Sequence, residues 1–252
     1  MEVVPLATVL ARPDVWRGGH FADAALPAMA SGFAGLDHEL PGGGWPRGAL
    51  TELLCDGAGQ GEMTLLLPAL KQLCAEDGWL VLIAPPYPLH AGALAAAGIP
   101  LERLLIVETG NNKRAYLDAL WTAEQALSSD AASAVLCWSM QAENKAVRRL
   151  QLAAATSHAA SFLVRPTRAG TQASAAPLRL ALKARHGGLD VNILKRRGPP
   201  LAMPLHLVLP RPAKWRSHQH SVPSSYATHG NALARPLPSA TVTRHPSSPA
   251  FR

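Results

Sequence analysis

The feature that most constrains the fold is an alternation of strand-like and helix-like segments between residues 50 and 164. Longer segments with apolar residues at helical spacing separate short apolar runs at 50–54, 79–84, 104–108, 133–138 and 161–164. Successive strands with a helix between them must join by crossovers, so we predict an α/β fold. Its sheet is mostly parallel, with helices on both faces. Three further strand-like runs, at 178–183, 189–195 and 205–209, follow without helices and predict a C-terminal antiparallel extension.

Composition divides the chain into three parts. Residues 1–30 form an N-terminal segment, and residues 31–210 hold the predicted α/β core domain. Residues 32–48 within that core are rich in Gly and Pro and are expected to be mostly irregular. Residues 211–252 are dense in Pro, Ser, His and Thr and contain six Lys or Arg but no acid, so a disordered basic tail is expected.

Charge and apolar content limit the classes of function. The formal net charge is +7, and residues 165–197 contain eight basic residues and one acid, so nonspecific DNA contact is one interpretation and simple solubility another. No apolar run reaches the ~20 residues that a membrane-spanning helix needs. The three cysteines lack metal-ligand spacing. We therefore expect a soluble cytoplasmic protein with reduced thiols and no metal site or membrane contact.

A glycine-rich turn follows the strand at residues 50–54 and precedes a helix, which is the layout of a phosphate-binding loop. The candidate cofactor-binding residues are Gly57, Gly59, Gly61, Glu62 and Thr64. A working loop needs Lys after the last Gly and then Ser or Thr for Mg²⁺. Here Glu62 follows Gly61, and Thr64 is displaced by one residue. A turn that never bound nucleotide, weak ATP binding and real hydrolysis remain the alternatives.

A second part of the phosphoryl-transfer apparatus is also missing. The strand at residues 134–139 ends without an Asp or Glu that could bind a metal ion. We therefore expect no catalytic residues, no required cofactor and no enzymatic activity.

Several motifs resemble those of known families. Residues 31–37 (SGFAGLD) and 50–53 (LTEL) are similar to the lead-in to the phosphate loop of RecA-type recombinases. Residues 40–54 (LPGGGWPRGALTELL), 59–62 (GQGE) and 194–200 (LKRRGPP) resemble the ImuA family, whose RecA-related members are also labelled SulA-like. The resemblance covers roughly residues 10–210.

The ImuA resemblance implies a non-hydrolysing accessory role in translesion DNA synthesis during the SOS response. The implied partners are RecA, an ImuB-type Y-family polymerase-like protein and an error-prone replicative-type polymerase. The SulA label implies inhibition of cell division through a tubulin-like ring protein. An ATP-binding recombination or repair protein is the remaining alternative.

Seven residues are candidates for contact with a partner or nucleic acid. Trp45 and Arg47 lie in the Gly/Pro-rich loop, where a large ring could anchor a partner or instead pack over the sheet. Arg165 and Arg168 follow a predicted strand at the edge where ligands dock in parallel sheets. Lys195, Arg196 and Arg197 follow another strand, and they cannot all point inward. Phosphate contact, partner contact and a solvated turn remain open for them.

Overall fold

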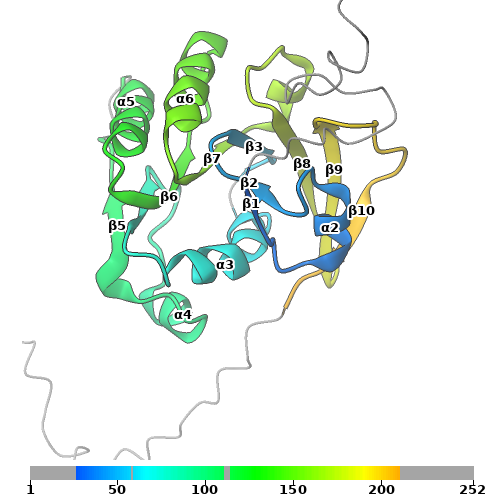
Figure 1. Cartoon of the computed structure of the whole chain (residues 1–252), viewed down its shortest axis with the longest axis horizontal. Helices are drawn as coiled ribbons and strands as arrows, with labels where there is room; N and C mark the ends of the chain where they lie inside the picture. Colours follow the sequence, from blue (N-terminus) through cyan, green and yellow to red (C-terminus); the bar gives the residue numbers. More distant parts are fainter. Residues whose placement is uncertain (1–26, 58, 111–113, 211–252) are drawn as a thin grey trace, which may run out of the picture. The chain divides into compact units, whose positions relative to one another are not determined.

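A computed structural model of the chain describes residues 27–57, 59–110 and 114–210 (Figure 1). The predicted tail at 211–252 and most of the N-terminal segment lie outside the described residues. No helix in the described part of the chain is both long and apolar enough to cross a membrane.

An eight-stranded sheet forms the centre of the described region, in the order β10-β9-β8-β3-β7-β6-β4-β5. The six strands from β8 to β5 are parallel, whereas β9 and β10 are antiparallel to their neighbours. The predicted α/β fold and its antiparallel extension are therefore confirmed. The strand bounds are β3 (Leu50–Leu54), β4 (Trp79–Ile83), β5 (Leu104–Val107), β6 (Ala132–Trp138), β7 (Ala160–Arg165), β8 (Leu178–Arg185), β9 (Gly188–Lys195) and β10 (Leu205–Val208).

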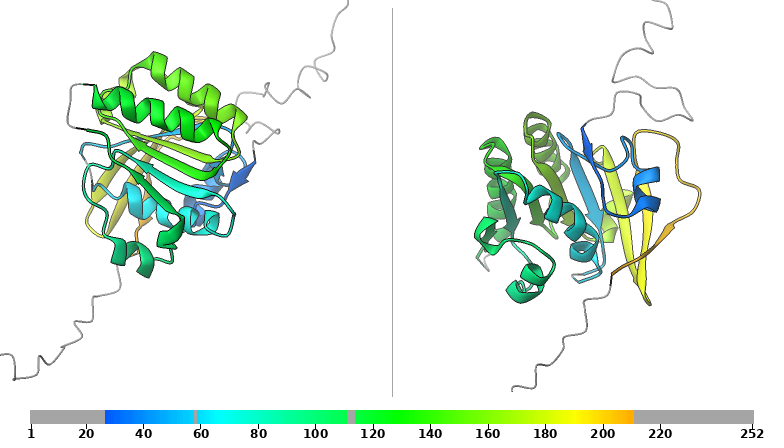
Figure 2. Two further views of the ribbon diagram at one scale, coloured as in Figure 1. Left: turned by 90° about the vertical axis from the view of Figure 1, so that its left-hand side faces the viewer. Right: turned by 60° about the horizontal axis from the view of Figure 1, so that its bottom comes forward.

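Helices cover both faces of the sheet, as Figure 2 shows. α5 and α6 pack side by side on one face, and α3 lies on the other. Each face has its own apolar core, because side chains alternate between the two faces along each buried strand. The bounds are α2 (Ala34–Glu39), α3 (Glu62–Leu73), α4 (Ala91–Ala96), α5 (Ala115–Ser128) and α6 (Asn144–Thr156), with 3₁₀ turns η1 (Leu101–Arg103) and η2 (Thr167–Thr171).

The Gly/Pro-rich stretch is more ordered than its composition predicts. It contains α2, whose Leu36 is fully buried, and β2 (Trp45–Pro46), which pairs with β1 (Ala28–Met29). Gly44 allows this pairing, since a Cβ there would lie 1.9 Å from the carbonyl oxygen of Met29. The prediction of a mostly irregular segment was therefore wrong, because buried contacts order the chain where local propensity does not.

β3 occupies the middle of the sheet and pairs in parallel with β7 on one side and β8 on the other. Leu50 is opposite Ser161, and Thr51 is opposite Leu178. All five residues of β3 are buried. The loop that follows β3 therefore emerges from the centre of the carboxyl edge, which is where parallel sheets place ligand sites.

Candidate functional site at the degenerate phosphate loop

The loop between β3 and α3 has the backbone of a phosphate-binding loop. Gly57, Gly59 and Gly61 all have positive φ, at 93°, 75° and 105°, a conformation that glycine adopts without strain. Gly61 is the N-cap of α3, so the free N–H groups of the first helical turn open toward the loop. This geometry would suit an anion, because those N–H groups carry partial positive charge.

The protein supplies an anion of its own at this position. The Glu62 side chain is only 2% exposed, and its Oε1 accepts a hydrogen bond of 3.0 Å from the backbone N–H of Gly59. A carboxylate in the first turn of α3 also favours the helix dipole. Its Oε2 is buried with no hydrogen-bond partner in the described structure. Glu62 therefore turns back into the loop and takes an N–H that a phosphate would otherwise use.

Apolar side chains close the loop from another side. A Cβ placed on Gly61 would lie 3.1 Å from a methyl group of Leu209 and 3.4 Å from one of Leu189. Leu189 belongs to β9 and Leu209 follows β10, so the C-terminal strands press against the start of α3. Apolar leucine side chains thus lie next to Gly61, where a bound nucleotide would place its charged phosphates.

Neither the ends of β4 and β6 nor the start of α3 completes a metal site. β4 is followed by Ala84 and two prolines, and β6 is followed by Ser139 and Met140, so neither provides a carboxylate. Thr64 lies in the first turn of α3, two residues after Glu62. Throughout the described ranges, no three His, Cys, Asp or Glu side chains gather in a way that could hold a metal ion.

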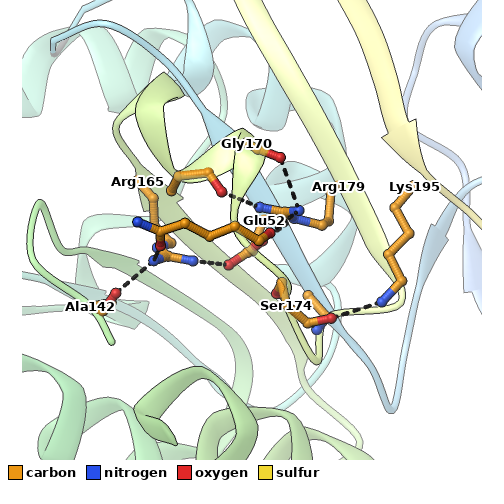
Figure 3. A network of polar contacts seen from close by, with 10 residues as sticks. Glu52, Ala142, Arg165, Gly170, Ser174, Arg179 and Lys195 are labelled. Atoms are coloured by element: carbon orange, nitrogen blue, oxygen red, sulfur yellow. Dashed lines mark hydrogen bonds and ion pairs between the residues drawn. The ribbon is translucent and has the colours of Figure 1, made fainter. Parts of the chain in front are cut away.

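A buried ion network lies beside the loop, on the face of the sheet covered by α5 and α6 (Figure 3). Glu52 of β3 is fully buried and accepts hydrogen bonds from Arg165 of β7 at 2.7 Å and from Arg179 of β8 at 2.5 Å. Arg165 also donates to the carbonyl oxygen of Ala142, and Arg179 donates to that of Ala169 at 2.7 Å. The network ties three adjacent strands to the η2 segment.

This network changes the interpretation of Arg165. The side chain was expected at the surface as a contact for a partner or nucleic acid, but the residue is 2% exposed and its guanidinium is occupied inside the protein. Arg168 lies nearer the surface, where it donates to the carbonyl oxygen of Met140 at 2.9 Å. Thr167 of the same turn donates to Asp56 in the phosphate loop. The η2 turn is thereby fixed to the loop, and the contact of Arg168 with a partner or nucleic acid stays a prediction.

The three adjacent cations after β9 point in different directions. Lys195 donates to the carbonyl oxygen of Ser174 at 2.8 Å, and desolvation, followed by the nearby charge of Arg179, lowers the pKa of its ammonium group. Arg196 is half-buried and donates to Glu39 of α2 at 2.8 Å. Arg197 is also half-buried. Lys195 and Arg196 therefore connect the end of β9 to the segment after η2 and to α2. Phosphate or partner contact by the three cations stays a prediction.

Trp45 and Arg47 are likewise structural in this fold. Trp45 is fully buried and packs edge-on against Phe162, with ring centroids 5.5 Å apart. Arg47 forms a bidentate ion pair with Glu76 at 2.6 and 2.7 Å and also donates to the carbonyl oxygen of His158. Trp45 is thus unavailable as the exposed anchor that its loop position suggested.

Comparison with known proteins shows the family to which the chain belongs. Residues 48–161 match the family model described as "Cell division inhibitor SulA". The chain is 31% identical over 122 residues to SulA of Photorhabdus laumondii, covering 48% of this chain and 67% of that protein. It is 33% identical over 119 residues to SulA of Pseudomonas aeruginosa, covering 46% and 71%. The chain belongs to the SulA family.

Two further likenesses accompany this assignment. Protein RecA 1 of Myxococcus xanthus is 29% identical over 98 residues, which cover 40% of this chain and 28% of that protein. The crystal structure of SulA from Pseudomonas aeruginosa matches with a TM-score of 0.38 and 30% identity, over 46% of this chain and 97% of that one. The matches to the SulA family model and to SulA sequences confirm the predicted SulA-like character, and the match to RecA supports distant RecA-like homology. The narrower assignment to ImuA stays a prediction.

The SulA match ends early in β7, so β8, β9 and β10 lie beyond it. Glu52 and Arg179 join these added strands to the SulA-matched part, yet neither was among the residues singled out from the sequence. A signal for them existed, because Glu52 is the one charged residue of β3 and Arg179 lies between two leucines at the buried start of β8. Such a charge is retained in a core only when it is paired.

Proposed function

We propose that this member of the SulA family acts in the DNA-damage response by binding another protein, without hydrolysing a nucleotide. The observation that carries the proposal is the buried carboxylate of Glu62, which accepts the Gly59 N–H within the phosphate loop. Triphosphate binding would bring negative charge against that carboxylate in a poorly solvated place, which costs free energy. The missing carboxylates after β4 and β6 support the same conclusion.

Nucleotide binding can be tested directly by thermal unfolding of the full chain with ATP and Mg²⁺. A ligand at 100 times its dissociation constant stabilises a protein by about 2.7 kcal/mol, which for a domain of this size raises Tm by about 5–10 °C. We expect no shift at millimolar ATP and no phosphate release above a buffer control. A clear shift accompanied by phosphate release would replace this proposal with an ATP-dependent recombination or repair function.

Inhibition of cell division is the first candidate activity, and the family match supports it. The relatives in the comparison carry the name "Cell division inhibitor SulA", and the matched residues include β3, the phosphate loop, α5 and α6. In this role the chain would bind a tubulin-like division-ring protein and block its polymerisation. Light scattering of that polymerisation, with and without the purified chain, measures the effect.

A translesion-synthesis adaptor is the second candidate, and two specific observations favour it. The chain is also similar to RecA over about 100 residues. Its sheet continues through β8, β9 and β10 beyond the SulA match, and the buried Glu52 network makes those strands integral to the fold. In this role the chain would bind RecA and an ImuB-type polymerase-like protein, and through them an error-prone polymerase.

One pull-down experiment separates the two candidates. The full chain is immobilised and offered the division-ring protein, RecA with and without single-stranded DNA, and the polymerase-like protein, each at low and high salt. Salt-resistant retention of the ring protein alone supports division inhibition, and salt-resistant retention of RecA or the polymerase-like protein supports the adaptor role. Retention only at low salt would point to nonspecific attraction by the basic tail and would count against both.

A further inference from the structure

The C-terminal strands leave one face of the sheet uncovered. In β8, β9 and β10, alternate side chains such as Leu180, Val191 and Leu207 pack into the apolar core on the side of α2 and α3. On the opposite side, α5 packs on β4 and β6 and α6 packs on β3, so both helices lie over the other half of the sheet (Figures 1 and 2). The outward side chains of β8, β9 and β10 therefore form an open face in the described structure. Its exposed members include Lys183, Arg185, Asn192, Lys195, His206 and Val208.

Positive charge extends in a line along this open face. Lys183 and Arg185 lie two residues apart on β8, which places them about 7 Å apart along the strand. Lys195 of β9 is opposite Arg179, four residues before Lys183, so it lies about 13 Å farther along the same line. Within the described ranges Lys183 forms no ion pair, and Lys195 donates to the uncharged carbonyl oxygen of Ser174. Neither ammonium group is therefore paired with a carboxylate in this part of the chain.

Asp190 is the one acid among the residues of β8, β9 and β10, and its carboxylate already has partners. It lies on β9 between Lys183 of β8 and His206 of β10. Its Oδ1 is 2.9 Å from Nδ1 of His206 and 3.5 Å from Nη1 of Arg185. In the sequence after β10, residues 211–252 add six Lys or Arg and no acid. The open face and the sequence that follows it thus both carry an excess of positive charge.

We propose that the open face binds the phosphate backbone of a nucleic acid, with Lys183, Arg185 and Lys195 as the contacting cations. The charges of a nucleic acid repeat along its whole length, so it is complementary to a line of cations of about 20 Å. The further positive charge of residues 211–252 favours such a long polyanion over a short acidic peptide. β8, β9 and β10 contain no Phe, Tyr or Trp on which bases could stack. Binding is therefore independent of base sequence, and it does not depend on which protein the chain inhibits or bridges.

The test is the affinity of the full chain for labelled oligonucleotides, measured by fluorescence anisotropy over a range of salt concentrations. Single-stranded DNA, the corresponding duplex and single-stranded RNA are the probes. Combining Lys183→Glu with Arg185→Glu should weaken binding of the single strand by about tenfold or more, because each substitution replaces a phosphate contact by a repulsion. The same variant should reduce the slope of log affinity against log salt by about 1.4, which corresponds to two lost contacts with a single strand.

The matched control combines Lys71→Glu with Arg103→Glu, which changes the net charge by the same amount. Lys71 is exposed on α3, on the other side of the sheet, and Arg103 precedes β5, at the opposite edge of the sheet from β10. Charges this far from the open face are screened at physiological salt, where the Debye length is about 8 Å. We therefore expect the control to bind nearly as tightly as the wild type. Lys183→Arg keeps the cation and should also keep the affinity.

Four outcomes would overturn the proposal. If the Lys183 and Arg185 variant binds as the wild type does, the attraction belongs to residues 211–252 alone. If it and the control lose the same affinity, only net charge matters. If polyglutamate at equal charge concentration displaces the oligonucleotide completely, the face suits an acidic protein segment rather than phosphates. A wild-type chain that binds none of the probes at physiological salt would refute it outright. Circular dichroism and Tm of each variant check that it is folded.

Discussion

Replacing Glu52 with glutamine removes the carboxylate that lies between two buried guanidinium groups. Glu52 is fully buried, with an exposed fraction of 0%, and Arg165 and Arg179 are 2% and 5% exposed. Glutamine keeps the shape and one acceptor oxygen but leaves two positive charges in the core with no counter-charge. Breaking a buried ion pair by removing one partner typically costs about 3–5 kcal/mol.

That cost is a large part of the free energy of unfolding of an ordinary domain, which is about 5–15 kcal/mol. Urea denaturation followed by circular dichroism should therefore show a much lower midpoint for Glu52→Gln than for the wild type. The matched control is Glu76→Gln. Its partner Arg47 is partly solvated and the Glu76 side chain is 41% exposed, so we expect a loss of about 0–1 kcal/mol.

A second variant separates charge from packing. Adding Arg179→Met to Glu52→Gln removes one of the two unpaired cations, so the double variant should be more stable than Glu52→Gln alone. If Glu52→Gln costs no more than Glu76→Gln, then the network does not hold the added strands to the rest of the sheet. If Arg179→Met made the variant less stable still, then the hydrogen bonds from Arg179 to the carbonyl oxygens around η2 would outweigh the charge effect, and the electrostatic reasoning would be refuted.

Three further predictions concern other parts of the fold. Gly44→Ala should lower Tm, because its Cβ would meet the backbone of β1 at 1.9 Å, whereas Gly35→Ala meets nothing within 4 Å and should leave Tm equal or higher. In native protein an alkylating reagent should label Cys55 much more slowly than Cys74, because burial raises the pKa of the Cys55 thiol to about 12, and equal rates would contradict this. The hydrogen bond that Arg196 donates to Glu39 lowers the pKa of the Glu39 carboxyl group. The Glu39 carboxylate therefore stabilises the fold above its unfolded pKa of about 4.3, and this stabilisation is lost as pH falls through the lower pKa of the folded state. The stability difference between wild type and Glu39→Gln should therefore shrink in acid, and a constant difference between pH 7 and pH 3 would refute it.

Much of the fold followed from the sequence because its signals are local. Five apolar runs of strand length with helices between them admit few arrangements besides a parallel sheet. The glycine turn before α3 could also be predicted, because glycine adopts positive φ without strain, as Gly57, Gly59 and Gly61 do. The replacement of the expected lysine by Glu62 needed only the order of residues.

The positions of the basic residues were harder to predict, because they depend on which faces meet after folding. The sequence shows eight cations between residues 165 and 197, and a charge count treats them alike. In the structure, Arg165 and Arg179 are buried because both donate to the carboxylate of Glu52, which lies on a strand more than 100 residues earlier in the chain. Likewise, Trp45 packs against Phe162 of β7, more than 100 residues later in the chain. Such pairings need tertiary contacts that no local pattern contains.

The central position of β3 has a consequence for how the chain acquires its fold during synthesis. β3 is the first strand of the large sheet to leave the ribosome, yet both of its neighbours, β7 and β8, are among the last parts of the core to be made. Until they arrive, a strand whose five residues are all buried in the native state has two open edges. Pairings this distant in sequence form slowly and expose nascent chains to aggregation. The yield of folded protein in a cell should therefore depend on chaperones and on the rate of translation, and a chain cut before residue 178 should aggregate rather than fold.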